Sequence, residues 1–280
     1  MMRRTQRALL LLTATSSVRV NALAASRVFN VQLPKLPSGG ELQLFEGLED
    51  AGDDDDGDSL AELFTVGGTV WPCAASLCTW LLNNPQCVQG AKVLELGSGT
   101  GVCGLYAAAS GAERVLLTDY SERLLKLCAN NCERNMLHGN LPGLGTTKHI
   151  SYETLLWNDS PTPRGPFDLV IGSDVTYEFD ENAHANLAAT LDALLRMEGD
   201  APRIVLSHQH RNRSPAHTLS QWDGDDEPLQ RFLDALGSHR LQATQLVWER
   251  PDAGVAGDEV TPLDGADEIS IIEVTRCSES

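Results

Sequence analysis

The chain is short of basic side chains. It has 21 Lys and Arg against 39 Asp and Glu, which gives a formal net charge of −18 at pH 7. Residues 1–40 hold six of the basic residues and no acidic one, so the rest of the chain has 15 basic and 39 acidic side chains and a formal charge of −24. Such an acidic body argues against binding of nucleic acid through its phosphates. It favours a protein partner with a basic surface, although solubility alone also explains the charge.

Long apolar segments are absent as well, so we expect no transmembrane helix and no membrane partner. A short apolar run at residues 8–12 follows Arg3, Arg4 and Arg7, which is typical of a targeting segment. The seven cysteines lack the spacing of a disulfide framework, and this favours a reducing compartment over secretion. We therefore expect an organelle, plastid or mitochondrion, if the leader is a targeting segment, and the cytoplasm if it is not.

The composition divides the chain into three parts. Residues 1–40 form a targeting-like or disordered leader, and residues 41–66 form an acidic linker. The linker-like composition begins at residue 36, and the like charges of the Asp run at 53–56 keep this stretch solvated. Residues 67–280 form the folded domain.

Strands and helical patterns alternate through the folded domain. Strands are predicted at 92–96, 114–118, 149–156, 167–171 and 203–207, with a closing pair near 242–247 and 268–274. This order predicts an α/β fold with a doubly wound, mostly parallel seven-stranded sheet and a terminal antiparallel hairpin. Phosphate-loop and nucleophile-elbow signatures are missing, which argues against P-loop nucleotide hydrolysis and α/β-hydrolase chemistry.

The most informative stretch is the glycine-rich turn after the first of these strands. It contains Gly97, Ser98, Gly99 and Gly101, and Glu95 precedes it inside the strand. A dinucleotide fold needs Gly-x-Gly-x-x-Gly so that a pyrophosphate can approach backbone amides. A carboxylate at Glu95 would repel a pyrophosphate, but it suits a ligand with a cationic amino-acid end.

A second acidic residue supports a nucleoside ligand. Asp119 closes the next strand, 22 residues after Gly97, where a carboxylate can accept hydrogen bonds from ribose hydroxyls. Together, Glu95, the glycine turn and Asp119 resemble the S-adenosylmethionine site of class I, seven-strand methyltransferases. This resemblance implies S-adenosylmethionine as the cofactor.

Three further features lie around this predicted pocket. Trp71 follows two glycines before the first helix, where it either covers a ligand or anchors the core. Trp157 follows the third strand and either stacks beside an adenine ring or serves in packing. Ser173, Asp174 and Tyr177 follow the fourth strand, so a carboxylate and a phenol can face an incoming nucleophile.

With these residues the chain resembles the protein-lysine methyltransferases that carry a D/E-x-x-Y motif, the methyltransferase-like 21 type. Residues 67–280 would then be the methyltransferase domain, with Asp174 and Tyr177 as its catalytic pair. Two features depart from the usual pattern, the leader and the Asn that follows Trp157. The resemblance implies a cofactor site formed by Trp71, Glu95, Gly97, Ser98, Gly99, Gly101, Asp119, Trp157 and Ser173.

The expected reaction transfers a methyl group to a lysine amine of a protein. Asp174 would hold and orient the amine, and Tyr177 would shape its channel. Alternatives within the fold are a small-molecule substrate or a protein histidine, and other classes are a nicotinamide-dependent oxidoreductase or a non-catalytic interaction module. His208 and His210 lack a carboxylate at ligand spacing, so we predict rim residues and no metal site.

Overall fold

The computed structural model describes residues 31–46, 67–141, 149–157, 163, 165–176, 182–210, 226–249 and 268–278. Most of the predicted leader, the Asp run at 53–56, and Tyr177 lie outside these ranges. In the part of the chain that is described, no helix has the length and apolar character needed to cross a membrane. None of the seven cysteines forms a disulfide.

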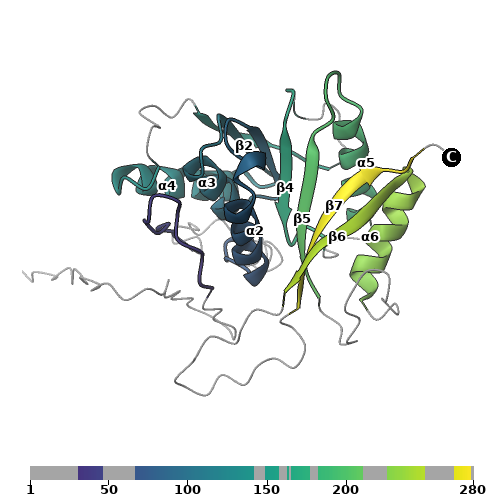
Figure 1. Cartoon of the computed structure of the whole chain (residues 1–280), viewed down its shortest axis with the longest axis horizontal. Coiled ribbons are helices and arrows are strands. Elements are labelled where there is room, and N and C mark those ends of the chain that lie inside the picture. The colour runs from purple at the N-terminus through teal and green to yellow at the C-terminus, as the bar shows by residue number, and fades with distance from the viewer. Residues whose placement is uncertain are drawn as a thin grey trace, which may run out of the picture.

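A seven-stranded sheet forms the centre of the domain, in the order β3-β2-β1-β4-β5-β7-β6 (Figure 1). Strands β1 to β5 are parallel, and β7 runs antiparallel to both β5 and β6. The predicted α/β fold with a terminal antiparallel pair is therefore confirmed. The strands are β1 (Lys92–Leu96), β2 (Arg114–Asp119), β3 (Ile150–Thr154), β4 (Leu169–Ser173), β5 (Arg203–Gln209), β6 (Leu241–Glu249) and β7 (Ile269–Arg276).

Helices cover both faces of the sheet, so the central parallel strands β1, β4 and β5 are buried on two sides. Val93 of β1 packs in the core cluster that includes α2 and α3, whereas Leu94 and Leu96 pack in the cluster that includes α5 and α6. Figure 1 shows these two groups of helices on opposite sides of the sheet. The helices are α2 (Pro72–Asn83), α3 (Val102–Ala109), α4 (Glu122–Leu137), α5 (Ala183–Leu195) and α6 (Glu227–Ser238), with a 3-10 turn η1 at Pro85–Cys87.

The strand order reverses at β1. From β1 the chain proceeds outward to β2 and β3, then returns to β4 on the other side of β1. In open α/β sheets this reversal opens a crevice beyond the carboxyl ends of the two central strands, and ligands bind there. The segments that follow β1 and β4 carry the glycine turn and Asp174, so the fold brings these two predicted site segments together.

Residues 31–46, which we call the strap, lie against the domain, although residues 36–46 were expected to be part of a solvated linker. Leu36 and Leu42 are each 3% exposed and belong to the core cluster that includes α2 and α3. The side-chain amide of Asn135 in α4 both donates to and accepts from the backbone of Gln43, at 2.7 and 2.9 Å. The strap therefore packs as part of the folded domain.

A second asparagine repeats this contact one helical turn earlier. Asn131 accepts from the Phe45 N–H at 2.6 Å and donates to the Phe45 carbonyl at 3.2 Å. It also donates to the carbonyl of Thr100, in the glycine turn, at 2.9 Å. Asn131 and Asn135 are fully buried. Their side-chain amides pair with the backbone of the strap as a neighbouring strand would, and Asn131 also connects the strap to the glycine turn.

We expect deletion of residues 1–46 to destabilise the domain. The free energy of unfolding should fall by about 4 kcal/mol or more, because two leucines lose about 2 kcal/mol of burial each and two buried asparagines lose partners. Deletion of residues 1–30, which leaves the strap intact, is the matched control and should change it little. Denaturant unfolding measures both, and equal stability of the two shortened chains would contradict the role given to the strap.

Candidate active site

A cavity of about 610 Å³ opens at the carboxyl ends of β1, β2 and β4. Trp71, Glu95, Gly97, Ser98, Gly99, Asp119, Trp157 and Ser173 line it, as does Asp174 of the predicted catalytic pair. Sequence positions from 71 to 174 are thus brought to one cavity, as the pattern predicted. The individual roles of these residues remain predictions.

Gly101 is the predicted cofactor residue that does not line the cavity. It precedes α3 with a φ of 79°, a left-handed conformation that favours glycine. A Cβ atom there would come within 3.1 Å of Cys128 Sγ. Gly101 therefore serves the turn and the packing of α3 against α4, and its contact with the cofactor stays a prediction.

Gly99 allows two segments of the pocket wall to touch. Its φ is 50°, and a Cβ atom at this position would lie 2.5 Å from the carbonyl oxygen of Gly67. A side chain there would push apart the glycine turn and the segment that carries Trp71. The backbone N–H of Gly99 donates to Asp119 Oδ2 at 3.0 Å, so the turn is also tied to the end of β2.

Glu95 is a buried carboxyl group, 2% exposed, that faces both the cavity and α3. Its Oε2 accepts from the Gly104 N–H at 2.9 Å. Burial raises the pKa of Glu95 to about 8, although the hydrogen bond from Gly104 opposes the shift. At neutral pH the free protein therefore holds Glu95 largely protonated, and a cation bound beside it would favour the carboxylate.

Asp119 ends β2 on the cavity wall and is 5% exposed. Besides Gly99, it accepts from the Ser121 N–H through Oδ1 at 3.1 Å. Burial raises its pKa, and the backbone hydrogen bonds oppose that effect. These bonds fix the orientation of the carboxylate that was predicted to bind ribose hydroxyls.

Asp174 occupies an unusual backbone conformation directly after β4. Its φ is 54°, in the left-handed region that Asp tolerates better than most residues. The side chain is largely buried and lines the cavity. Its Oδ1 accepts from the Gln209 N–H at 3.4 Å, so β5 holds it in place.

Tyr120 and Asn186 are among the lining residues that were not predicted from the sequence. Tyr120 is 43% exposed beside Asp119 and offers an aromatic ring at the rim of the cavity; an aromatic directly after the acid that ends the strand was the available signal. Asn186 also lines the cavity. It belongs to α5, which packs on the face of the sheet opposite to α2 and α3. No local pattern marks Asn186, because its position depends on how α5 packs.

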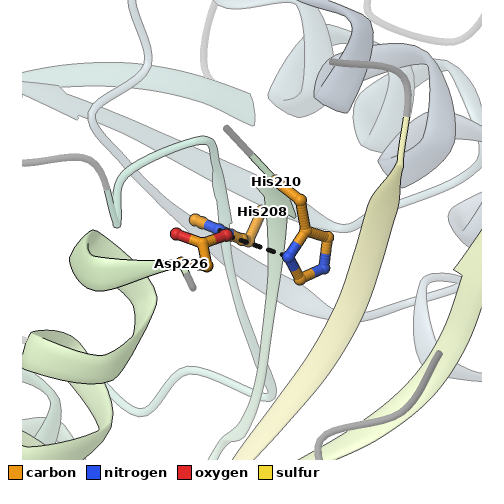
Figure 2. A group of neighbouring side chains, drawn as sticks. All are labelled: His208, His210 and Asp226. Carbon is orange, nitrogen blue, oxygen red and sulfur yellow. Dashed lines mark hydrogen bonds and ion pairs between the residues drawn. The ribbon is translucent and has the colours of Figure 1, made fainter. Parts of the chain in front are cut away.

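The prediction for the histidine pair is wrong in two respects, the missing carboxylate and the rim position of His208. Asp226, just before α6, supplies the carboxylate that sequence spacing did not reveal (Figure 2). Its Oδ2 lies 2.8 Å from His208 Nε2 and 2.9 Å from His210 Nδ1. His208 is completely buried, so it is not a rim residue. These three side chains could in principle hold a metal ion, but their spacing is that of hydrogen bonds.

The match that decides the family covers the whole cavity. A family model described as lysine methyltransferase matches residues 59–223. The chain belongs to this family. The resemblance inferred from the D/E-x-x-Y motif and the glycine turn is thereby confirmed, and a nicotinamide-dependent oxidoreductase is set aside.

Individual family members show how far the similarity extends. The protein N-lysine methyltransferase METTL21A of Danio rerio is 36% identical over 114 residues, covering 40% of this chain and 49% of that protein. The human histone-arginine methyltransferase METTL23 is 32% identical over 161 residues, covering 55% and 77%. The calmodulin-lysine N-methyltransferase of Arabidopsis thaliana is 29% identical over 199 residues, covering 69% and 59%. The chain thus spans from about half to about three quarters of these relatives.

The cofactor of this family member is S-adenosylmethionine, and the residues of the cavity fit it. Glu95 is a buried acid that a cationic amino group would compensate, and Asp119 presents carboxylate oxygens suited to hydroxyl groups. Trp157 adds an aromatic face to the same wall. When bound, the cofactor would supply an electrophilic methyl group, and these side chains would position it.

Binding of S-adenosylmethionine at pH 7 should release up to about one proton from Glu95, because its pKa falls when a cationic amino group binds nearby. Affinity should therefore rise between pH 6 and pH 8. Calorimetry in buffers with different ionisation enthalpies measures the proton count. Glu95→Gln keeps an acceptor for Gly104 but cannot ionise, so it should remove this release. An unchanged release in the variant would assign the proton to another group.

Proposed function

We propose that this protein is a methyltransferase that uses S-adenosylmethionine to methylate the side-chain amine of a lysine in a protein substrate. The position of Asp174 carries the proposal, since its carboxylate lies directly after β4 on the wall of the cofactor cavity. Family membership supports the same reaction class. So do the names of the relatives METTL21A and calmodulin-lysine N-methyltransferase.

The chemistry needs a neutral amine in line with the methyl group. A lysine ammonium must first lose its proton, and a site of low dielectric constant favours that loss. Asp174 accepts a hydrogen bond from the amine and orients its lone pair towards the methyl group, while water receives the proton. Tyr177, three residues later, keeps its predicted role at the substrate channel. Alignment of the two reactants supplies much of the acceleration.

An arginine side chain is the second candidate acceptor. The similarity to human METTL23, a histone-arginine methyltransferase, reaches 77% of that protein. A guanidinium stays protonated at neutral pH and presents several N–H donors. Asp174 would then hold the acceptor by charge-assisted hydrogen bonds, without needing a free lone pair from the start.

The substrate we propose is a protein with a basic surface. The chain outside residues 1–40 has a formal charge of −24, which steers basic partners towards the enzyme and repels nucleic acid. The proposed location is an organelle, plastid or mitochondrion, if residues 1–40 act as a targeting segment, and otherwise the cytoplasm. Residues 1–30 lie outside the described structure.

The acceptor can be identified by incubating the protein with isotope-labelled S-adenosylmethionine and a protein extract. Mass spectrometry of the labelled peptides should find methyl groups on lysine. Labelled arginine would support the second candidate, and labelled histidine or a labelled small molecule would refute both. Asp174→Asn serves as the inactive control in the same extract.

We expect Asp174→Asn to lower kcat by about 100-fold, because a misplaced acceptor loses its alignment. The affinity for S-adenosylmethionine should stay within about twofold, since Asn also tolerates the left-handed backbone of this position. Asp234→Asn is the matched control, because Asp234 is exposed on α6 and remote from the cavity. Full turnover of Asp174→Asn would remove Asp174 from the reaction.

A further inference from the structure

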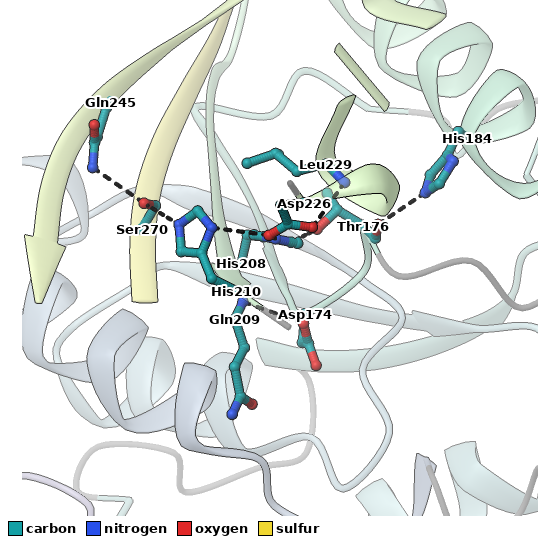
Figure 3. A network of polar contacts seen from close by, with 10 residues as sticks. All are labelled: Asp174, Thr176, His184, His208, Gln209, His210, Asp226, Leu229, Gln245 and Ser270. Carbon is teal, nitrogen blue, oxygen red and sulfur yellow. Dashed lines mark hydrogen bonds and ion pairs between the residues drawn. The ribbon is translucent and has the colours of Figure 1, made fainter. Parts of the chain in front are cut away.

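The segment that follows β4 is held by a row of buried polar contacts from β5, α5 and the start of α6 (Figure 3). The backbone N–H of Asp174 donates to the Ser207 carbonyl at 2.9 Å. Thr176, two residues later, is fully buried. Its carbonyl accepts from His184 Nε2 at 2.9 Å, and its hydroxyl lies 2.6 Å from His208 Nδ1.

Contacts continue from His208 to the far edge of the sheet. His208 Nε2 and His210 Nδ1 both face Oδ2 of Asp226. The other oxygen of Asp226 accepts from the Leu229 N–H at 3.3 Å and so caps α6. His210 Nε2 lies 2.8 Å from the Ser270 hydroxyl, which also accepts from Gln245 at 3.1 Å.

The charge of Asp226 determines which ring nitrogens of His208 and His210 are protonated. Burial alone would raise the pKa of Asp226, but hydrogen bonds from the two histidines outweigh it and hold the pKa well below its usual value. Asp226 is therefore a carboxylate, which only accepts, and His208 Nε2 and His210 Nδ1 carry the protons. Burial also lowers the pKa of His208 against the opposing effect of Asp226, so the ring is neutral.

It follows that Nδ1 of His208 is an acceptor and that the hydroxyl of Thr176 donates to it. This contact fixes the side chain of Thr176 in one orientation. The hydroxyl, imidazole and carboxylate resemble a hydrolase triad in composition, but Thr176 is buried and does not line the cavity. It therefore has no access to a substrate, and its effect must be on the backbone that carries it.

We propose that Thr176, His208 and Asp226 are positioning residues that hold the Asp174–Thr176 segment in the conformation needed for methyl transfer. A left-handed non-glycine residue is strained and persists only where its surroundings impose it. Asp174 is in this conformation, and the contacts of Thr176 restrain the backbone two residues after it. The inference rests on the proposed function, because it assigns these residues to the alignment of the same acceptor.

Thr176→Val and Thr176→Ser form the decisive pair. Valine keeps the shape of threonine and removes the hydroxyl, whereas serine keeps the hydroxyl and removes a methyl group. In the full chain, Thr176→Val should lower kcat by about tenfold through poorer alignment, and Thr176→Ser should stay within about threefold. The dissociation constant for S-adenosylmethionine should change by less than about twofold in both, since Thr176 is outside the cavity.

A second readout does not depend on methyl transfer. Amide hydrogen exchange at Asp174 should become about tenfold faster in Thr176→Val, because the segment opens locally more often, and should change little in Thr176→Ser. If the wild-type protein methylates no substrate, the proposed function fails while this comparison still tests the segment. Equal exchange and equal kcat in the two variants would overturn the inference, as would a loss of cofactor affinity in step with kcat.

If Thr176→Val does not fold, Asp226→Asn tests the same connection. Asparagine keeps an oxygen for the Leu229 N–H but cannot accept from both histidines, so the same selective loss of kcat is expected. Bound metal provides a further check. One equivalent of Zn²⁺ retained by the wild-type protein after dialysis and lost in His210→Ala would place a metal where the two protons are assigned. That result would overturn the assignment of protons to His208 Nε2 and His210 Nδ1.

Discussion

The position of β1 between two parallel neighbours is the constraint on which the rest of the site depends. Because β2 and β4 flank it in parallel register, the chain leaves all three strands at the same edge of the sheet. Glu95, Asp119 and Asp174 reach one cavity for this reason alone, although up to 79 residues separate them along the chain. Packing around the strand ends leaves at most 6% of each of these residues exposed. Strand order thus supplies the geometry of the site, and packing supplies the burial of its carboxyl groups.

Local patterns were sufficient to predict the order of elements and most of the cavity wall. Parallel strands and glycine turns leave signals within a few residues, as Glu95, Gly97 and Gly99 illustrate. The strap left no such signal, because Pro, Ser and Gly near residues 37–40 are typical of a linker. Its burial depends on asparagine contacts that span 86 and 92 residues. The partnership of His208 with Asp226 likewise depends on how α6 returns to β5.

Three buried carboxyl groups in the described structure are controlled in different ways. Burial dominates at Glu95 and raises its pKa, so its charge depends on what binds beside it. Burial would raise the pKa of Asp226, but hydrogen bonds from two imidazoles together outweigh it and hold the pKa well below its usual value. Asp119 lies between these cases, with backbone donors that partly offset its burial. The carboxyl group of Glu95 suits reversible ligand binding, and the carboxylate of Asp226 suits a fixed structural role.

The strap also has a consequence for the order of events during synthesis. Residues 31–46 leave the ribosome early, but the α4 asparagines that bind the backbone of Gln43 and Phe45 come 92 and 86 residues later. Such long-range contacts close late, because the intervening chain must be ordered first. The strap therefore docks only after α4 has been made. Until then the amino-terminal part of the chain is not tied to the domain, and proteins that bind nascent chains can reach it.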